Sequence, residues 1–491
     1  MIQENNKKCA VIGSGIAGIA AAIRMRNKGY CVHVYEANDF AGGKLSTETS
    51  KGYRFDMGPS VFTMPAYVDE LFELSGKDPR EFFNYISLDP VYQYFFEDGT
   101  VLDAFHDKEQ FASAMAEKTL DKKADILQYL DKTEVIYNLT AEVFLQNSLH
   151  KVKNYFTRRV AKGLWNFGKI GAFNTMNGAN QKAFKDPRLV QVFNRYATYN
   201  GSSPYLSPAT LNVIPFVEIV KGAWYPVGGM YSITSSLVQL AKDIGVQFHF
   251  STPVREILIT NKKVTGIRTD EKNTSYDVVI SNMDIYNSYQ KLMPSVKKPL
   301  RTLNQPKSSS GIIFYWGIKN EFKQLGLHNI LFSENYEQEF ETIFVKKAIC
   351  SDPTIYLNIT SKHTPGDAPA GCENWFTFIN VPNNCGQDWD KLVNEARKNI
   401  IQKINRVLKT DLAPMIETEM VFDPRVIEDR TSSAFGAIYG NSSNNKFAAF
   451  MRHPNFSKDI KNLYFCGGSV HPGPSIPLCL LSAKIATSLV K

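Results

Sequence analysis

The sequence predicts a mixed α/β (α+β) fold, and three stretches carry this prediction. Near the N-terminus, KKCAVIGSGIAGIAAAIRMRNKGYCVHVYE has the pattern of a strand, a glycine turn, a helix and a second strand within about 30 residues. Residues 246–284 alternate apolar and polar side chains and break at turn signals, which is typical of several consecutive strands. Residues 462–491 predict a buried strand, a Gly/Pro turn and a closing helix.

Length and composition predict a folded chain with more than one lobe. The 491 residues exceed what one simple core holds, so we expect two or three interwoven lobes. A hydrophobic content of 43% and a charged content of 21% are ordinary for a globular protein. The net charge of +8 is compatible with an anionic partner such as a membrane surface.

The cysteines and the apolar runs argue against several other classes of protein. Seven scattered cysteines without a CxxC pair predict neither a disulfide framework nor a metal site, and favour the cytoplasm. Since no window holds roughly 18 uninterrupted apolar residues, no transmembrane helix is predicted. The opening apolar run imitates a secretion signal, but its glycines weaken a signal helix, and Arg24 and Arg26 follow it.

The first strand–turn–helix–strand unit has the spacing of a dinucleotide site in a Rossmann-like lobe. Gly13 allows the tight turn, Gly15 lets the backbone approach a pyrophosphate, and Gly18 allows close packing of helix and strand. Free N–H groups at the helix start face the phosphates. Glu36, at the end of the second strand, is placed to accept hydrogen bonds from a ribose.

The segments that follow indicate which dinucleotide is bound. A second glycine pair, Gly42 and Gly43, is followed by Lys44 and then by GYRFDMGPSVF, residues 52–62. This order resembles the superfamily of FAD-containing amine oxidases and carotenoid desaturases, which implies FAD as the cofactor. The superfamily usually has arginine at the position of Lys44, so we expect a looser phosphate contact here, because lysine lacks the bidentate fork.

The C-terminal stretch CGGSVHPGPSIP resembles the last motif of the bacterial phytoene-desaturase-type carotenoid desaturases. Pro477 suits a first helical turn, and that helix start would stabilise a reduced flavin. The chain departs from the pattern at Gly468, where an acidic residue is frequent, and at Pro474 and Ser475, which replace part of a glycine-rich turn. The implied FAD contacts are Gly13, Ser14, Gly15, Ile16, Ala17, Gly18, Glu36, Ala37, Gly42, Gly43, Lys44, Leu45, Gly58, Pro59, Ser60, Val254, Asn282, Gly467, Gly468, Ser469, Ile476 and Pro477.

The order of these motifs predicts a discontinuous domain organisation. Residues 1–75, 225–300 and 455–491 form the FAD-binding lobe. Residues 76–224 form a mainly helical region that faces the substrate and the membrane. Residues 301–454 form a mixed α/β substrate-binding region.

The substrate class follows from the resemblance and from a polar patch. WYPVGGM followed by a helix resembles the desaturase family pattern, and RYATYNGSSPY looks most like the branch that acts on 1-hydroxycarotenoids, the 3,4-desaturases. From the residues alone, this is a patch rich in Tyr and Ser that could bind a hydroxyl at one end of a long apolar ligand. The alternative is that the tyrosines are core residues. The predicted substrate contacts are Tyr196, Tyr199, Tyr205 and Trp224.

Residues 151–169 carry six basic side chains, no acidic ones and several aromatic ones. This pattern predicts an interfacial membrane contact, so the protein is expected to be cytoplasmic and peripheral on the membrane. The alternative is a solvated basic helix with inward-facing aromatic residues. No nucleic-acid-binding motif accompanies the stretch, so no nucleic-acid partner is expected.

The predicted reaction is the removal of a hydride and a proton from adjacent carbons of an acyclic or hydroxylated C40 carotenoid, with FAD as hydride acceptor. Glu218 and His453 are the candidates for accepting the proton. No second GxGxxG is present, so oxygen or a quinone is the expected electron acceptor. The alternatives are a phytoene desaturase, a carotenoid isomerase, an amine or porphyrinogen oxidase, and a non-enzymatic prenyl-lipid binding protein.

Overall fold

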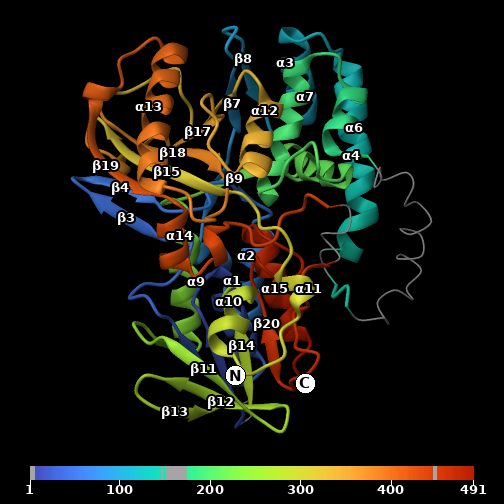
Figure 1. The fold of residues 1–491 in the computed structure, drawn as a ribbon, viewed down its shortest axis with the longest axis vertical. Helices are drawn as coiled ribbons and strands as arrows, with labels where there is room; N and C mark the ends of the chain where they lie inside the picture. Colours follow the sequence, from blue (N-terminus) through green and yellow to red (C-terminus); the bar gives the residue numbers. More distant parts are fainter. Residues whose placement is uncertain (1–5, 145–146, 151–173, 446–450) are drawn as a thin grey trace.

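The structure is a computed structural model, and it describes residues 6–144, 147–150, 174–445 and 451–491. A five-stranded parallel sheet has the order β10-β2-β1-β14-β20 and collects strands from three separated segments of the chain (Figure 1). Its strands are β1 (Lys8–Ile12), β2 (Cys31–Tyr35), β10 (Gln247–His249), β14 (Val278–Ser281) and β20 (Leu463–Phe465). The two ends of the chain therefore lie in one sheet.

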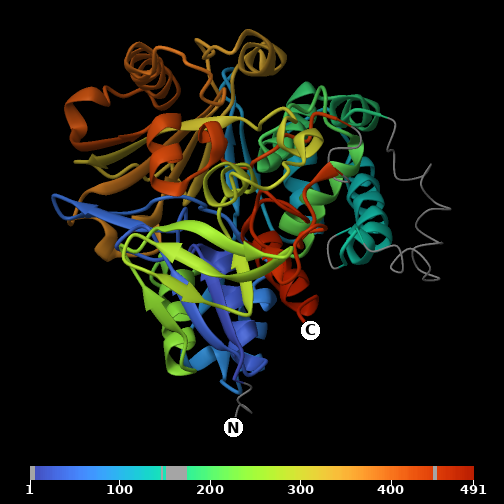
Figure 2. The same cartoon turned by 60° about the horizontal axis from the view of Figure 1, so that its bottom comes forward.

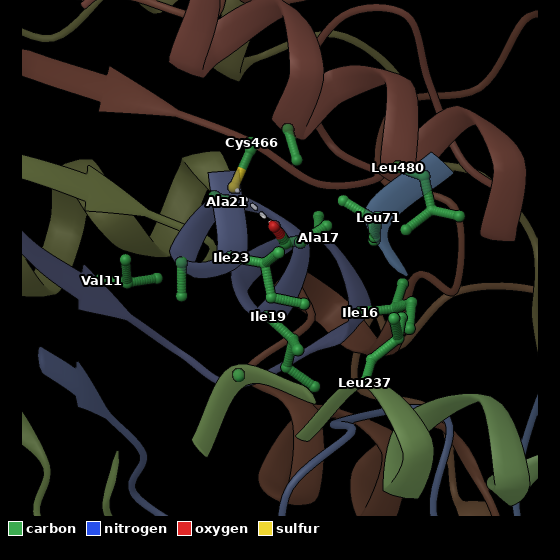
Figure 3. Close-up of a cluster of buried hydrophobic side chains, with 14 of the residues drawn as sticks. Val11, Ile16, Ala17, Ile19, Ala21, Ile23, Leu71, Leu237, Cys466 and Leu480 are labelled. Carbon is green, nitrogen blue, oxygen red and sulfur yellow. Dashed lines mark hydrogen bonds between the residues drawn. The ribbon is translucent and has the colours of Figure 1, made fainter. Parts of the chain in front are cut away.

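The helix α1 (Ile16–Asn27) is the centre of the core on one face of this sheet. It packs against α2 (Ala66–Leu74), α9 (Tyr231–Asp243) and α15 (Ile476–Ser488). Figure 3 shows Ile16 and Ile19 of α1 among the side chains of Leu71, Leu237 and Leu480. Every α1 residue from Ile16 to Met25 is buried. The glycine and alanine residues among them allow the neighbouring helices to pack closely.

A three-stranded antiparallel sheet covers the other face. It is formed by β11 (Val254–Thr260), β12 (Lys263–Thr269) and β13 (Asn273–Ser275). Alternate residues of β1 point to opposite faces, so Val11 packs against α1 while Ala10 packs with Ile257 and Ile267. Figure 2 shows these yellow-green strands in front of the blue N-terminal strands. The strands predicted within residues 246–284 are confirmed.

A seven-stranded mixed sheet forms the other half of the molecule, with the order β19-β15-β18-β17-β16-β7-β8. Its strands are β7 (Tyr92–Phe95), β8 (Val101–Ala104), β15 (Ser310–Ile318), β16 (His328–Leu331), β17 (Ile355–Ile359), β18 (Glu373–Val381) and β19 (Ile416–Phe422). The helix α13 (Trp389–Leu408) packs on this sheet. Because β7 pairs in parallel with β16, the predicted helical region 76–224 contributes two strands to the sheet of region 301–454.

Helices from residues 108–194 stand beside this sheet, and the grey trace in Figure 1 marks the chain that is not described. These helices are α3 (Lys108–Lys118), α4 (Lys123–Phe144), α6 (Met176–Ala183) and α7 (Pro187–Asn194). The predicted membrane-contact stretch, residues 151–169, lies outside the described residues. Within the described ranges, no helix has both the length and the apolar character needed to cross a membrane.

Candidate active site

A cavity of about 1040 Å³ connects the two halves of the molecule. At one end it is lined by the glycine turn after β1, the second glycine pair and the turn between β20 and α15. At the other end it is lined by residues of the seven-stranded sheet and of the segment 195–218. All predicted FAD contacts line this cavity except Ser14, Ala17 and Gly18.

The first glycine turn is shaped by short backbone contacts. Gly13 has φ +92° and donates its N–H to the Tyr35 carbonyl at 2.8 Å. A Cβ on Gly18 would lie 2.1 Å from the Gly13 carbonyl oxygen, and a Cβ on Gly15 would lie 2.7 Å from Asn282 Oδ1. No described side chain caps the start of α1, so its first N–H groups are available to an anionic ligand.

Glu36 is a buried carboxylate at the cavity wall. Its Oε2 accepts hydrogen bonds from the Ser14 backbone N–H at 2.8 Å and the Ser14 hydroxyl at 2.7 Å. Its Oε1 accepts from the Asn38 backbone N–H at 3.0 Å. Ser14 does not line the cavity, so it orients Glu36, which keeps acceptor capacity for a ribose hydroxyl.

Lys44 is buried beside the cavity, and its ammonium donates to the Ile438 carbonyl at 2.6 Å. Burial lowers the pKa of Lys44, and burial raises the pKa of Asp284, its acidic neighbour at the cavity wall. The lysine is therefore fixed by a backbone carbonyl. This contact leaves Lys44 with further donors for a phosphate.

The C-terminal turn brings a second buried cation to the cofactor end. Arg452 donates to the carbonyl oxygens of Gly468 and Asn441, both at 3.2 Å. No carboxylate pairs with it among the described residues, and burial lowers its pKa to about 10. The predicted place of Pro477 in the first turn of α15 is confirmed. Sequence reasoning missed Arg452, because its role depends on the Gly468 turn packing against it.

These observations test whether FAD fits the residues present. The glycine turn has no room for a Cβ at Gly15 or Gly18, the α1 start is uncapped, and two buried cations adjoin the turns that would hold a pyrophosphate. Glu36 offers a ribose acceptor at the end of β2. The chain therefore has the donors, acceptor and space that an FAD needs.

The other end of the cavity holds a buried polar cluster. Arg195 Nη2 lies 3.3 Å from Glu218 Oε1, and these side chains are 7% and 2% exposed. Tyr196 and Tyr199 both donate to the Glu218 carboxylate. Of the four predicted substrate contacts only Tyr199 lines the cavity, whereas Tyr196 supports Glu218 from behind.

Tyr205 and Trp224 do not line this cavity, so the structure gives no support to the prediction that they contact the substrate. Tyr205 packs against Phe340, and Trp224 in β9 (Ala223–Pro226) packs edge-on against Tyr85. Both residues are fixed by neighbouring aromatic side chains. Arg195, which the sequence reasoning missed, adjoins the predicted Tyr196 and reaches the cavity.

His453 is not brought together with Glu218. Its Nε2 lies 3.1 Å from the Tyr289 hydroxyl and its Nδ1 lies 2.7 Å from the Pro454 carbonyl. The ring does not line the cavity, and burial lowers its pKa to about 4. This placement contradicts a direct catalytic role, because both ring nitrogens face the protein core.

Comparison with known proteins gives relatives over the full length of the chain. The 1-hydroxycarotenoid 3,4-desaturase of Flavobacterium sp. (strain P99-3) is 51% identical over 484 residues, covering 99% of each chain. The 4,4'-diapolycopene oxygenase of Methylomonas sp is 31% identical, covering 99% of this chain and 98% of the relative. A 4,4'-diaponeurosporene oxygenase of Staphylococcus aureus (strain MSSA476) is 33% identical, covering 97% of each. The predicted relationship to the carotenoid desaturases is confirmed.

Solved structures share the fold. Cyclohexylamine oxidase from Brevibacterium oxydans IH-35A superposes with a TM-score of 0.62 at 14% identity, covering 99% of this chain and 98% of that one. Wild-type putrescine oxidase bound to putrescine gives a TM-score of 0.62 at 12% identity, covering 99% of each chain. Residues 16–490 match the model of the flavin-containing amine oxidoreductases. The chain therefore belongs to the flavin-containing amine oxidoreductase family and is an FAD-dependent oxidoreductase.

Proposed function

We propose that this protein is an FAD-dependent carotenoid desaturase that introduces a C=C bond into the hydroxylated end of an acyclic C40 carotenoid, as in 1-hydroxycarotenoid 3,4-desaturation. The observation that carries the proposal is the 51% identity, over 99% of both chains, to a protein of that named activity. Most of the predicted FAD contacts line the same cavity as Arg195, Tyr199 and Glu218 of the polar cluster, which supports the proposal.

The walls of the cavity suit a long apolar ligand. The lining includes aliphatic and aromatic side chains, among them Leu211, Ile214, Ile313, Ile330 and Phe376. A C40 polyene in water would cost on the order of tens of kcal/mol, at about 0.8 kcal/mol per buried CH₂-sized group. Apolar side chains in the wall of the cavity that also holds the predicted FAD contacts reduce that cost.

The residues of the chain would act mainly by orientation. When bound, FAD supplies the two-electron oxidation, in which a C–H bond next to the polyene loses a hydride and the adjacent carbon loses a proton. The apolar wall holds the carbon chain in one register and keeps water out. Of the two predicted proton acceptors, only Glu218 reaches the cavity. Oxygen or a quinone then takes the two electrons.

Product analysis tests the proposal. Purified protein with bound FAD is incubated with a 1-hydroxylated acyclic carotenoid, and the product mass is measured. Desaturation removes two hydrogens. A carotenoid that gains oxygen points to an oxygenase, the second candidate, because the oxygenase relatives are 31% and 33% identical. An unchanged mass with altered geometry indicates an isomerase.

Membrane binding through residues 151–169 is part of the same proposal. Its support is the run of basic and aromatic residues, the net charge of +8 and the need to collect a substrate from a bilayer. Liposome sedimentation of a variant with Lys151, Lys153, Arg158, Arg159 and Lys162 changed to Glu tests it. The control changes five basic residues elsewhere, namely Lys319, Lys323, Lys391, Lys398 and Lys409. Equal binding of the two variants would refute this contact.

A further inference from the structure

A buried ion pair lies in the wall of a cavity that otherwise suits a hydrocarbon. Arg195 and Glu218 both line the cavity, and each side chain is more than nine-tenths buried. Taking two charges out of water carries a large penalty, which their mutual attraction offsets only with good geometry. A purely apolar ligand would gain nothing from them, so the pair indicates a polar group on the ligand.

The guanidinium of Arg195 is held in place by an aromatic cage. Its Cζ lies 4.4 Å from the ring centre of Tyr92 and 4.7 Å from that of Tyr196, with Tyr94 and Tyr199 both at 5.5 Å. Cations over aromatic faces are attracted to the rings. Nη2 also donates to the Tyr94 hydroxyl at 3.2 Å. The cage holds the Arg195 guanidinium next to Glu218, so this guanidinium is not free to move towards a ligand.

A count of the hydrogen bonds that Glu218 accepts shows where its carboxylate can take another donor. Glu218 Oε1 accepts from Arg195 at 3.3 Å and from Tyr196 at 2.7 Å. Among the described residues, Oε2 accepts only from Tyr199, whose hydroxyl also lies 2.9 Å from that of Tyr92. Each carboxylate oxygen accepts about two hydrogen bonds, so Oε2 has one acceptor site left. Its complement is an O–H donor on an uncharged ligand.

Further contacts link this cluster to Ser60, which is one of the predicted FAD contacts. The Ser60 hydroxyl lies 2.7 Å from the Tyr356 hydroxyl, which lies 2.8 Å from His328 Nδ1. The His328 ring lies 5.1 Å from that of Tyr92. In a 1-hydroxycarotenoid a single carbon separates C1 from C3, so the hydroxyl receptor has to lie close to the reacting bond. This chain of contacts links Glu218, through Tyr199 and Tyr92, to a residue predicted to contact FAD.

We propose that Glu218 Oε2 receives the hydrogen bond of the tertiary C1 hydroxyl, and that Tyr199 and the caged Arg195 position the carboxylate. This inference rests on the proposed function and names the group that selects hydroxylated over plain acyclic carotenoids. Binding the hydroxyl also fixes the register of the carbon chain, so that C3 and C4 are placed at the reaction position. No bond is formed or broken at Glu218 in this role.

The test compares two substrates that differ only in the hydroxyl. FAD-loaded wild type, Glu218→Gln and Tyr199→Phe are assayed with a 1-hydroxylated acyclic carotenoid and with its non-hydroxylated counterpart. We expect the ratio of the two kcat/KM values to fall about 10- to 100-fold in Glu218→Gln, with a rise in KM for the hydroxylated substrate. Tyr199→Phe should shift the ratio in the same direction, which keeps the test open if Glu218→Gln does not fold.

Tyr315→Phe is the matched control. The Tyr315 hydroxyl is buried and has no hydrogen-bond partner among the described residues, and the side chain does not line the cavity. Its loss should leave the ratio unchanged. A ratio that also stays unchanged in Glu218→Gln overturns the inference, and equal losses of kcat on both substrates assign Glu218 to proton acceptance instead.

A binding measurement distinguishes failure of this inference from failure of the proposed function. If the wild type converts neither carotenoid, the proposed function fails, and the shift of the carotenoid absorption band on binding still decides the inference. The wild type should then bind the hydroxylated carotenoid about 10-fold or more tightly, and Glu218→Gln should remove that preference. Equal binding of both carotenoids by the wild type refutes the inference that Glu218 receives the hydrogen bond of the hydroxyl.

Discussion

The Ser14 hydroxyl donates a 2.7 Å hydrogen bond to Glu36 Oε2, and the Ser14 backbone N–H donates to the same oxygen at 2.8 Å. The end of β2 is thereby joined to the glycine turn after β1. This junction places a buried carboxylate at the cavity wall before any ligand arrives, so little reorganisation is needed for binding.

Glu36→Gln should weaken FAD binding. The amide introduces a donor where Ser14 and Asn38 already donate, and it loses hydrogen bonds to a charged acceptor worth about 1.5–3 kcal/mol. We expect an FAD dissociation constant at least about 10-fold higher, measured by calorimetric titration of the apoprotein. Glu395→Gln, at an exposed position of α13, is the control. Equal FAD affinity in both variants would exclude Glu36 from the cofactor site.

Gly18→Ala should damage the first turn. Its Cβ would lie 2.1 Å from the Gly13 carbonyl oxygen, and this backbone atom cannot move without opening the turn. Overpacking of this kind costs roughly 1–3 kcal/mol. We expect a lower melting temperature and a lower flavin content per chain. Gly366→Ala, where nothing lies within 4 Å of the added Cβ, should behave like the wild type.

Arg452→Met should separate stability from cofactor binding. Its guanidinium has no described carboxylate partner, so removing it relieves the cost of a buried charge while the cofactor loses a cation. We expect the melting temperature of the apoprotein to fall little and the shift caused by FAD to shrink. Arg397→Met, which breaks a partly exposed ion pair with Glu419, should keep the full shift. An undiminished shift in Arg452→Met would contradict a role toward the cofactor.

Stability should fall in mildly acidic solution. Burial lowers the pKa of His453 from 6.5 to about 4, so between these values the unfolded chain binds a proton that the native chain does not. The stability that neutral His453 contributes is therefore present above pH 6.5 and is lost as the pH falls towards 4, on the order of 3 kcal/mol.

Calorimetric melting temperatures between pH 7.5 and 4.5 measure this dependence. His453→Gln should flatten it without abolishing it, because burial also lowers the pKa of His471 to about 4 and that of His328 to about 3. His106→Gln, at a partly exposed position, is the control. A slope that is unchanged in His453→Gln would argue against the buried neutral state.

Local signals in the sequence determined the cofactor end of the site. The spacing of Gly13, Gly15 and Gly18, the acid at Glu36 and the position of Pro477 each reflect contacts within one turn or one strand–helix unit. Such contacts depend on chain geometry over a few residues, so the pattern alone predicts them. The mixed α/β class follows from the same local patterns.

Only the tertiary structure decided the substrate end. Arg195 meets Glu218 across 23 positions of sequence, and Ser60 meets Tyr356 across 296. The tertiary structure also leaves His453, Tyr205 and Trp224 outside the lining of the cavity. Long-range neighbours depend on how sheets and helices dock, which periodicity in one segment does not encode. The sequence by itself therefore determined a flavin-type glycine cradle, while packing of the segment 195–218 against β7 created the buried polar cluster in the cavity wall.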